Sequence, residues 1–301
     1  MLRLARIALV FLMTLAMPVQ AGSIMLILSD KGGVYGEFSK GLEESLSGTN
    51  WNISATLLPD SPAISGPAPD LIITVGVEAL KKAWAKGDPT PIVATLLPRL
   101  SYERVVTQPR RGMPRITAIF LDQPPARQAV FLRQLLPGQK PAGMLLSSET
   151  KHLFSQYRQA FANNSLTLES EESERSETLL PALNALLGRS AFLLAIPDSS
   201  IYQRTNIKAI LITAFRHQKP VIGYSPAFVN AGALAALHTT PAQIARQTAD
   251  MIVSNGTNLP TPVGPNQFAI AINPTVAQAL GLNIPDESTI RRAMLADREF
   301  R

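Results

Sequence analysis

Short, continuous apolar runs alternate along the chain with longer segments in which apolar residues recur with a helical period. Residues 23–28 (SIMLIL) form the first run, which ends at Ser29-Asp30 and is typical of a strand buried on both faces. Residues 34–46 follow with the periodicity of a helix. The same order predicts strands over residues 51–57, 70–76, 91–96 and 116–121, and a helix over residues 78–84. Such alternation indicates a parallel sheet covered by helices.

The alternation starts again after Leu121, where Asp122 and two prolines end a predicted strand. Before that point, residues 101–115 show no clear periodicity. Beyond it, the pattern predicts helices over residues 126–136, 151–162, 178–187 and 207–216, and strands over residues 142–146, 166–169, 191–196 and 220–224. Each unit has about 100 residues, an ordinary size for an α/β domain. We therefore expect two α/β lobes, alike in architecture but without a repeat at the residue level.

The first 21 residues have the three-part pattern of a secretory signal peptide. Arg3 and Arg6 precede an apolar run over residues 7–16, and Pro18 and Ala21 supply a break and a small residue at the cleavage position. The run is shorter than the roughly 20 residues of a membrane-spanning helix; an uncleaved N-terminal anchor is the alternative. We interpret the pattern as cleavage after Ala21 and export to the periplasm as a soluble protein. A lipid anchor is not expected, because the sequence contains no cysteine.

Charge and composition argue against nucleic acid as a partner. The formal net charge is +6, with 28 basic and 22 acidic residues that are mostly scattered, and few aromatic residues lie among them. Without cysteine the fold must be held by its apolar core alone. His152, His217 and His238 lie too far apart in the sequence to suggest a metal site. We expect a monomer that needs neither a metal nor another cofactor.

Enzymatic motifs are incomplete. Residues 223–227 (GYSPA) begin like the nucleophile elbow of a hydrolase, but Ala227 stands where that motif has glycine. Pro226 also removes the N–H that would help to build an oxyanion hole. Gly33 and Gly36 lack the spacing of a dinucleotide-binding loop. The sequence thus predicts that the protein is not an enzyme and that Ser225 is not a nucleophile.

Polar or small residues follow most of the predicted strands and define a candidate ligand-binding site. In open α/β sheets the ligand crevice lies at the carboxyl ends of the strands, where helix N-termini also favour anions. The candidates are Ser29, Gly76, Thr95, Ser147, Asp198 and Tyr224, together with Tyr35 in the first predicted helix.

These candidates have different expected roles. Asp198 is assigned to a ligand amine, the helix start near Gly33 to a carboxylate, and the two tyrosines to stacking or to hydrogen bonding through the hydroxyl. Each has a structural alternative. Ser29, Ser147 and Asp198 could cap helices, and Tyr224 could belong to the core.

The last third of the chain carries a further pattern. It comprises residues 214–223 (AFRHQKPVIG), 228–235 (FVNAGALA), 259–263 (LPTPV), 268–273 (FAIAIN) and 280–285 (LGLNIP). In these segments the chain resembles the substrate-binding protein family of ABC transporters, whose few characterised members bind aromatic amino acids. The resemblance is specific over residues 208–285 and extends to the earlier part only in the order of elements.

The resemblance implies a type I periplasmic-binding-protein fold, with two Rossmann-like lobes of parallel sheets joined by three crossings. The crossings would fall near Leu121-Asp122, Ser225-Pro226 and residues 259–262. The first lobe would then hold residues 22–121 and 226–259, and the second lobe residues 122–225 and 260–301.

The implied function is to capture a small-molecule ligand between the lobes and deliver it to a membrane permease. The alternative is a periplasmic sensor that presents its ligand to a membrane signalling protein. Residues 110–118 (RRGMPRITA) depart from the family, which carries a Gly-rich segment and a Thr-Gly-Val just before the first crossing. Because this departure lies beside the expected cleft, the family's ligand does not carry over to this chain.

Overall fold

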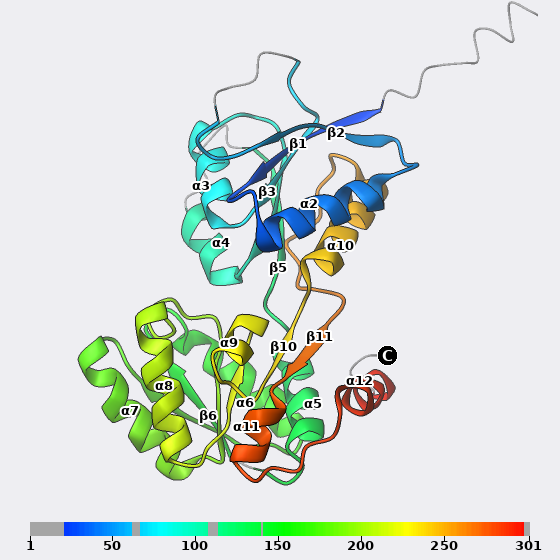
Figure 1. The fold of residues 1–301 in the computed structure, drawn as a ribbon. Helices are drawn as coiled ribbons and strands as arrows, with labels where there is room; N and C mark the ends of the chain where they lie inside the picture. Colours follow the sequence, from blue (N-terminus) through cyan, green and yellow to red (C-terminus); the bar gives the residue numbers. More distant parts are fainter. Residues whose placement is uncertain (1–20, 62–66, 108–113, 140, 298–301) are drawn as a thin grey trace, which may run out of the picture.

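Two α/β lobes, joined by a narrow connection, make up the molecule (Figure 1). The structure is a computed structural model that describes residues 21–61, 67–107, 114–139 and 141–297. Apart from Ala21, the predicted signal peptide lies outside these ranges. In the part of the chain that is described, no helix is long and apolar enough to span a membrane.

The first lobe contains a parallel five-stranded sheet in the order β2-β1-β3-β4-β5. Its strands are β1 (Gly22–Leu28), β2 (Trp51–Leu57), β3 (Leu71–Val75), β4 (Ile92–Leu97) and β5 (Ile116–Phe120). Two helices cover each face, α2 (Gly33–Leu46) and α10 (Pro241–Asn255) on one, and α3 (Val77–Lys86) and α4 (Arg99–Val106) on the other. All five residues of β3 are buried, as its uninterrupted apolar sequence predicts for a central strand.

Helix α10 reaches the first lobe from the far end of the sequence and packs along α2. Gly41 makes this close approach possible, because a Cβ atom there would lie 3.2 Å from the Cβ atom of Ala245. Phe38 and Leu42 of α2 and Ile244 of α10 are fully buried in the same core cluster. The first lobe is therefore completed by residues that lie more than 100 positions beyond its last strand.

The second lobe contains a six-stranded sheet in the order β11-β10-β9-β8-β6-β7, in which only β11 is antiparallel. Its strands are β6 (Ala142–Leu146), β7 (Leu168–Glu172), β8 (Phe192–Leu194), β9 (Val221–Gly223), β10 (Ala235–His238) and β11 (Ala269–Ile272). One face is covered by α5 (Pro125–Leu135), α6 (Phe154–Asn163), α11 (Pro274–Ala279) and α12 (Glu287–Ala296). The other is covered by α7 (Ser176–Arg189), α8 (Arg204–Arg216) and α9 (Pro226–Asn230). A 3-10 turn, η1 (Lys151–Leu153), precedes α6.

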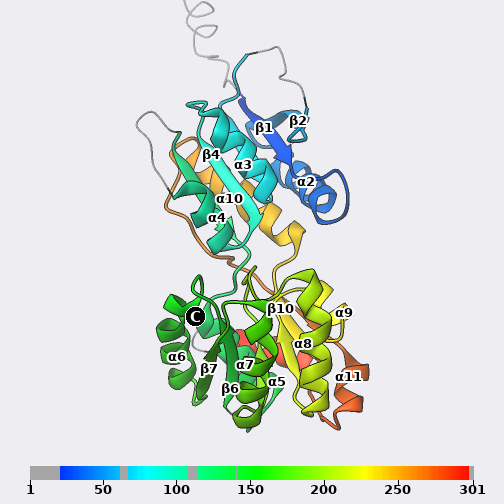
Figure 2. The ribbon, with the colours of Figure 1, turned by 90° about the vertical axis from the view of Figure 1, so that its left-hand side faces the viewer.

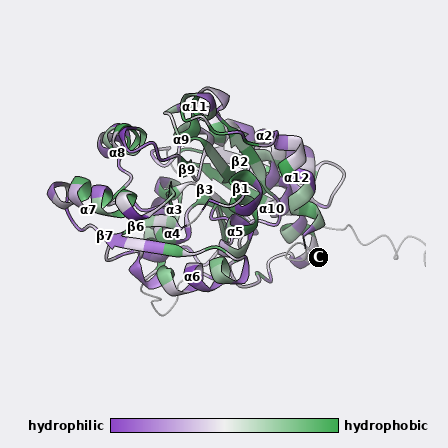
Figure 3. Cartoon of the chain, turned by 90° about the horizontal axis from the view of Figure 1, so that it is seen from below, coloured by the Kyte–Doolittle hydropathy of each residue, from purple (hydrophilic) through white to green (hydrophobic). Residues whose placement is uncertain are grey.

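Hydropathy follows these layers. Figure 3 shows apolar residues concentrated in the sheets and on the helix faces toward them, while the edge strand β7 is largely hydrophilic. Glu169 and Glu171 of β7 form ion pairs with Arg189 at the end of α7. A charged edge strand discourages pairing with the edge of another sheet.

The predicted fold class is confirmed, but the expected crossing at Ser225-Pro226 is wrong. Strand β10 pairs with β9 in the second sheet, so the chain remains in the second lobe until Thr239. Residues 226–239 therefore belong to the second lobe, where Phe228 and Leu234 are buried. The third crossing lies later than residues 259–262, since Val263 still bridges to Ile119 of the first sheet.

Three crossings join the lobes (Figure 2), at residues 121–124, 239–240 and 264–268. The buried side chain of Gln123 contacts the other two from the first. The amide nitrogen of Gln123, in the first crossing, donates hydrogen bonds to the carbonyl of His238 at 3.2 Å and to Thr239 Oγ1 at 2.5 Å. It also donates to the carbonyl of Gln267 in the third crossing, at 3.1 Å. Gln123 therefore holds all three crossings together where the two lobes meet.

Two further side chains hold the third crossing from opposite lobes. Arg127 of α5 donates to Gln123 Oε1 at 2.8 Å and to the carbonyl of Pro265 at 2.9 Å. Gln247 of α10 donates to the carbonyl of Gly264 at 3.0 Å and accepts from Asn266 N–H at 2.9 Å. These bonds tie the three crossings to one another and to both lobes, so we expect a movement of the lobes to be absorbed by a few backbone torsions in the crossings.

Replacing Gln123 by methionine tests this role. The variant removes the amide and leaves the carbonyls of His238 and Gln267 with fewer partners, so the free energy of unfolding should fall by about 1–3 kcal/mol. Urea unfolding followed by circular dichroism measures the change. Gln159→Met, at an exposed position of α6, is the matched control and should change the stability by less than about 0.5 kcal/mol. Equal stability of the two variants would show that Gln123 does not hold the crossings.

Candidate functional site

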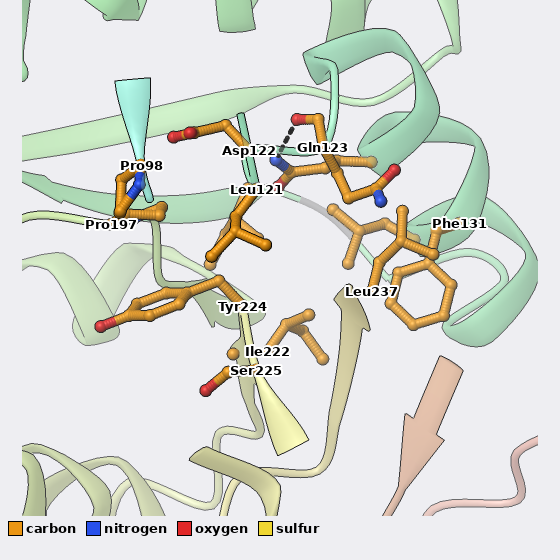
Figure 4. A pocket seen from close by; sticks show the side chains of 14 residues that line it. Pro98, Leu121, Asp122, Gln123, Phe131, Pro197, Ile222, Tyr224, Ser225 and Leu237 are labelled. Carbon is orange, nitrogen blue, oxygen red and sulfur yellow. Dashed lines mark hydrogen bonds between the residues drawn. The ribbon is translucent and has the colours of Figure 1, made fainter. Parts of the chain in front are cut away.

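The carboxyl ends of both sheets point toward the connection between the lobes, and a cavity of about 140 Å³ lies there (Figure 4). From the first lobe and the first crossing it is lined by Pro98, Leu121, Asp122 and Gln123. From the second lobe it is lined by Gln128, Phe131, Leu132, Leu194, Pro197, Ile222, Gly223, Tyr224, Ser225 and Leu237. The predicted location of the crevice, at strand ends and between the lobes, therefore coincides with a cavity.

Of the predicted site residues, Tyr224 lines this cavity directly. It follows β9, and its ring lies below Leu121 in Figure 4. Tyr202 and Phe228 pack against it, with ring centroids 6.2 Å and 5.2 Å away. Burial, with a smaller contribution from Asp198, raises the pKa of the Tyr224 hydroxyl, which stays protonated at neutral pH. Tyr224 therefore presents a fixed ring surface to the space between the lobes.

Ser29, Tyr35 and Gly76 lie together in the first lobe, as the sequence predicts. A Cβ atom on Gly76 would lie 2.6 Å from Ser29 Oγ and 2.8 Å from Tyr35 Cε1. Gly76 also has a positive φ of 91°, so only glycine fits this position without strain. Ser29 Oγ accepts a hydrogen bond from Ala79 N–H at 3.0 Å and so caps α3, which is the structural alternative for this residue.

The N-terminus of α2 lies beside this group. Its N-cap residue, Gly32, supplies no side-chain cap, and the first turn contains no acidic residue. Asp30 Oδ1 accepts from the N–H groups of Lys31 at 2.5 Å and Gly32 at 3.4 Å, both of which precede the first helical residue, Gly33. An uncapped helix N-terminus favours an anionic group.

Ser147 and Asp198 are buried, and their polar atoms are occupied. Asp198 Oδ2 accepts from Ser147 Oγ and from Thr150 Oγ1, each at 2.7 Å. Its Oδ1 accepts from the N–H groups of Ser200 and Ile201 at 2.9 and 3.2 Å. With 3% of Asp198 exposed, this carboxylate organises two loops of the second lobe. We therefore leave both residues out of the site and correct the role assigned to Asp198.

Thr95 is also a structural residue. It is fully buried within β4, and its hydroxyl donates to the carbonyl of Thr74 at 3.0 Å. The strand continues to Leu97, so the residue that reaches the cavity from this strand is Pro98. The sequence-based strand ends one residue early, at Leu96, and the predicted contact at Thr95 lies three positions before Pro98.

Sequence reasoning missed Asp122 as a site residue, although it identified Leu121-Asp122 as a crossing. Asp122 Oδ2 accepts a hydrogen bond from Arg99 N–H, the first residue of α4, at 2.6 Å. Burial raises the pKa of this carboxyl, and the bond from Arg99 only partly offsets that effect. Its position in the sequence could have identified it, because Asp122 directly follows a predicted strand, as most of the predicted site residues do.

Ser225 has a structural role that explains the Ser225-Pro226 pair. It is the N-cap of α9, with Oγ accepting from Phe228 N–H at 3.4 Å, and Pro226 occupies the first helical position. Both residue types are favoured at these positions. The Ser-Pro pair that resembles part of a hydrolase motif therefore starts a helix.

Substitution of Asp198 by alanine tests its reassignment. The change would leave four donors of the second lobe without their buried acceptor, and the free energy of unfolding should fall by about 2–4 kcal/mol. Chemical denaturation measures the loss. Asp250→Ala, at an exposed position of α10, serves as the control. A fully stable Asp198→Ala variant would contradict the structural role.

Solved structures of similar fold span nearly the whole chain. A substrate-binding protein with adhesive properties from Clostridium difficile, in its ligand-free, open structure, matches with a TM-score of 0.66 and 16% identity, over 89% of this chain and 97% of that one. An ABC domain from Streptococcus pneumonia in complex with L-Trp matches with a TM-score of 0.60 and 17% identity, over 90% and 97%. A conserved domain protein from Vibrio cholerae matches with a TM-score of 0.59 and 20% identity, over 90% and 98%.

At these identities the similarity supports the fold alone, which is that of periplasmic substrate-binding proteins. No curated protein matches the sequence. The family model for ABC transporter substrate binding proteins, however, matches residues 49–294, which is most of the chain and includes both lobes. The chain belongs to the family of ABC transporter substrate-binding proteins.

Proposed function

We propose that the protein captures a small solute between its two lobes in the periplasm and delivers it to an ABC permease. The observation that carries this proposal is the cavity at the carboxyl ends of both sheets, on a connection of three crossings. Ligand bound there would contact both lobes and would favour their closed arrangement. Membership of the substrate-binding family supports the same role.

The polar environment suits an amino-acid-like ligand. The uncapped N-terminus of α2, close to Ser29 and Gly76, would receive a carboxylate. Tyr35 from the first lobe and Tyr224 from the second would enclose the remainder of the ligand when the lobes close. The bound L-Trp of the pneumococcal structure is in keeping with a ligand of this kind.

One feature of the structure favours easy closure. Arg104 of α4 contacts the second lobe through Glu149 at 2.8 Å and Ser199 Oγ at 2.9 Å. Both charged side chains are substantially exposed, and exposed pairs contribute at most about 1 kcal/mol. A contact of this strength can be rearranged by the binding energy of a small ligand.

Ligand capture tests the proposal. Mature protein, freed of bound molecules by unfolding and refolding, is mixed with a metabolite extract and analysed by native mass spectrometry. We expect one small molecule to be retained per chain and to raise the stability by about 2.7 kcal/mol at a hundredfold excess over Kd. Tyr224→Ala should weaken retention at least about tenfold, near 1.4 kcal/mol, because the ring surface is lost.

Tyr224→Phe is the matched control, since it keeps the ring that contacts the cavity. It should retain the ligand within about threefold of the wild type, less than 0.7 kcal/mol. Failure of the folded wild-type protein to retain any metabolite would contradict the proposed function. Retention that is insensitive to Tyr224→Ala would place the ligand outside this cavity.

A further inference from the structure

The cavity between the lobes is amphipathic, and Asp122 carries the one formal charge among the described residues that line it. Apolar side chains, including Phe131, Leu132 and Leu237, form much of its wall. Figure 4 shows the Asp122 carboxylate on the Pro98 side, away from Phe131 and Leu237. A ligand in this cavity would therefore meet a carboxylate at one end and hydrocarbon at the other.

This carboxylate forms no direct ion pair within the described part of the chain. Among the described residues, no Lys, Arg or His side chain forms an ion pair with Asp122 within 4.0 Å. The nearby guanidinium of Arg99 lies instead over the ring of Phe120, 4.9 Å from its centroid. Burial raises the pKa of the half-buried Asp122 carboxyl, and the hydrogen bond from Arg99 N–H and the positive charge of Arg99 only partly offset that effect.

Asp198 shows how this fold satisfies a buried carboxylate whose role is structural. Each oxygen of Asp198 accepts two hydrogen bonds, from two hydroxyls and two backbone N–H groups. The side chain of Asp122 accepts one bond from another residue in the described structure, from Arg99 N–H. This bond to the first residue of α4 involves Oδ2, and Oδ1 accepts no hydrogen bond from another residue in the described structure.

We infer that Asp122 is a specificity-determining residue, which selects ligands that carry a protonated amine. The ammonium group would bind the Asp122 carboxylate, and an apolar group of the same ligand would extend toward Phe131 and Leu237. The inference rests on the proposed function, because it places the ligand in the same cavity. The volume of about 140 Å³ limits the apolar group to about the size of a benzene ring, which a cavity of about 150 Å³ accommodates.

The Asp122→Asn variant separates the charge from the helix cap. Asparagine retains an oxygen that can accept from Arg99 N–H, so α4 keeps its cap and the fold should be retained. Asp250→Asn, exposed on α10, is the control for loss of one negative charge. Ligand-free forms of both variants and the wild type are mixed with the same metabolite extract, and the retained molecules are identified by mass spectrometry.

The wild type and Asp250→Asn should retain a molecule with a protonated amine, and Asp122→Asn should bind it at least about tenfold more weakly. The second readout is the ratio of affinities for the retained ligand and for an analogue with a hydroxyl in place of the amine. If Asp122 had only a structural role, the Asp122→Asn variant would leave this ratio unchanged. The wild type should prefer the amine at least about tenfold, and Asp122→Asn should show little preference.

Three other outcomes would overturn the inference. If the retained ligand has no basic nitrogen, or if Asp122→Asn keeps both affinity and preference, the inference is wrong while the proposed function stands. If the wild type retains no metabolite, the proposed function itself fails, and the inference fails with it.

Discussion

The buried amide of Gln123 is the interaction on which the relation between the lobes depends. Each lobe has its own sheet and its own core clusters, so the crossings determine how the two are placed. Gln123 contacts both other crossings, and Arg127 extends the same network to Pro265. A network of this kind orders the crossings while leaving the facing strand ends free to approach each other. The cavity lies directly beside it.

Two carboxylates show how structural and binding roles can be distinguished in this fold. Asp198 lies at the carboxyl end of a strand, where ligands are expected, yet four donors of its own lobe occupy it. Asp122 lies at an equivalent end in the other lobe and accepts one strong bond from another residue, at Arg99. The two residues thus have similar positions relative to their sheets, and the count of donors separates them. The sequence contains no direct information on that count.

The sequence predicted the two-lobe α/β fold because its strands are buried on both faces and therefore form uninterrupted apolar runs. It located β2 and β6 to the residue. It missed α4, whose buried face is little more than Tyr102, and the strand pairing of β10, because the tertiary contacts that fix β10 come from distant segments. It placed Ser29, Tyr35 and Gly76 near one another, which the structure confirms, although their role in ligand binding stays a prediction. It overlooked Asp122 as a site residue, and it overlooked the amide network of Gln123, which depends on contacts over more than 100 residues.

The distance between the lobes is the most direct test of the account. Because the chain contains no cysteine, Glu37→Cys in α2 and Arg204→Cys in α8 give a specific pair of spin-label sites at exposed positions on either side of the cleft. Pulsed electron paramagnetic resonance then measures their separation with and without the captured ligand. We expect a shorter and narrower distance distribution when the ligand is bound. An unchanged distribution at saturating ligand would contradict a mechanism in which the solute is held between lobes that close around these crossings.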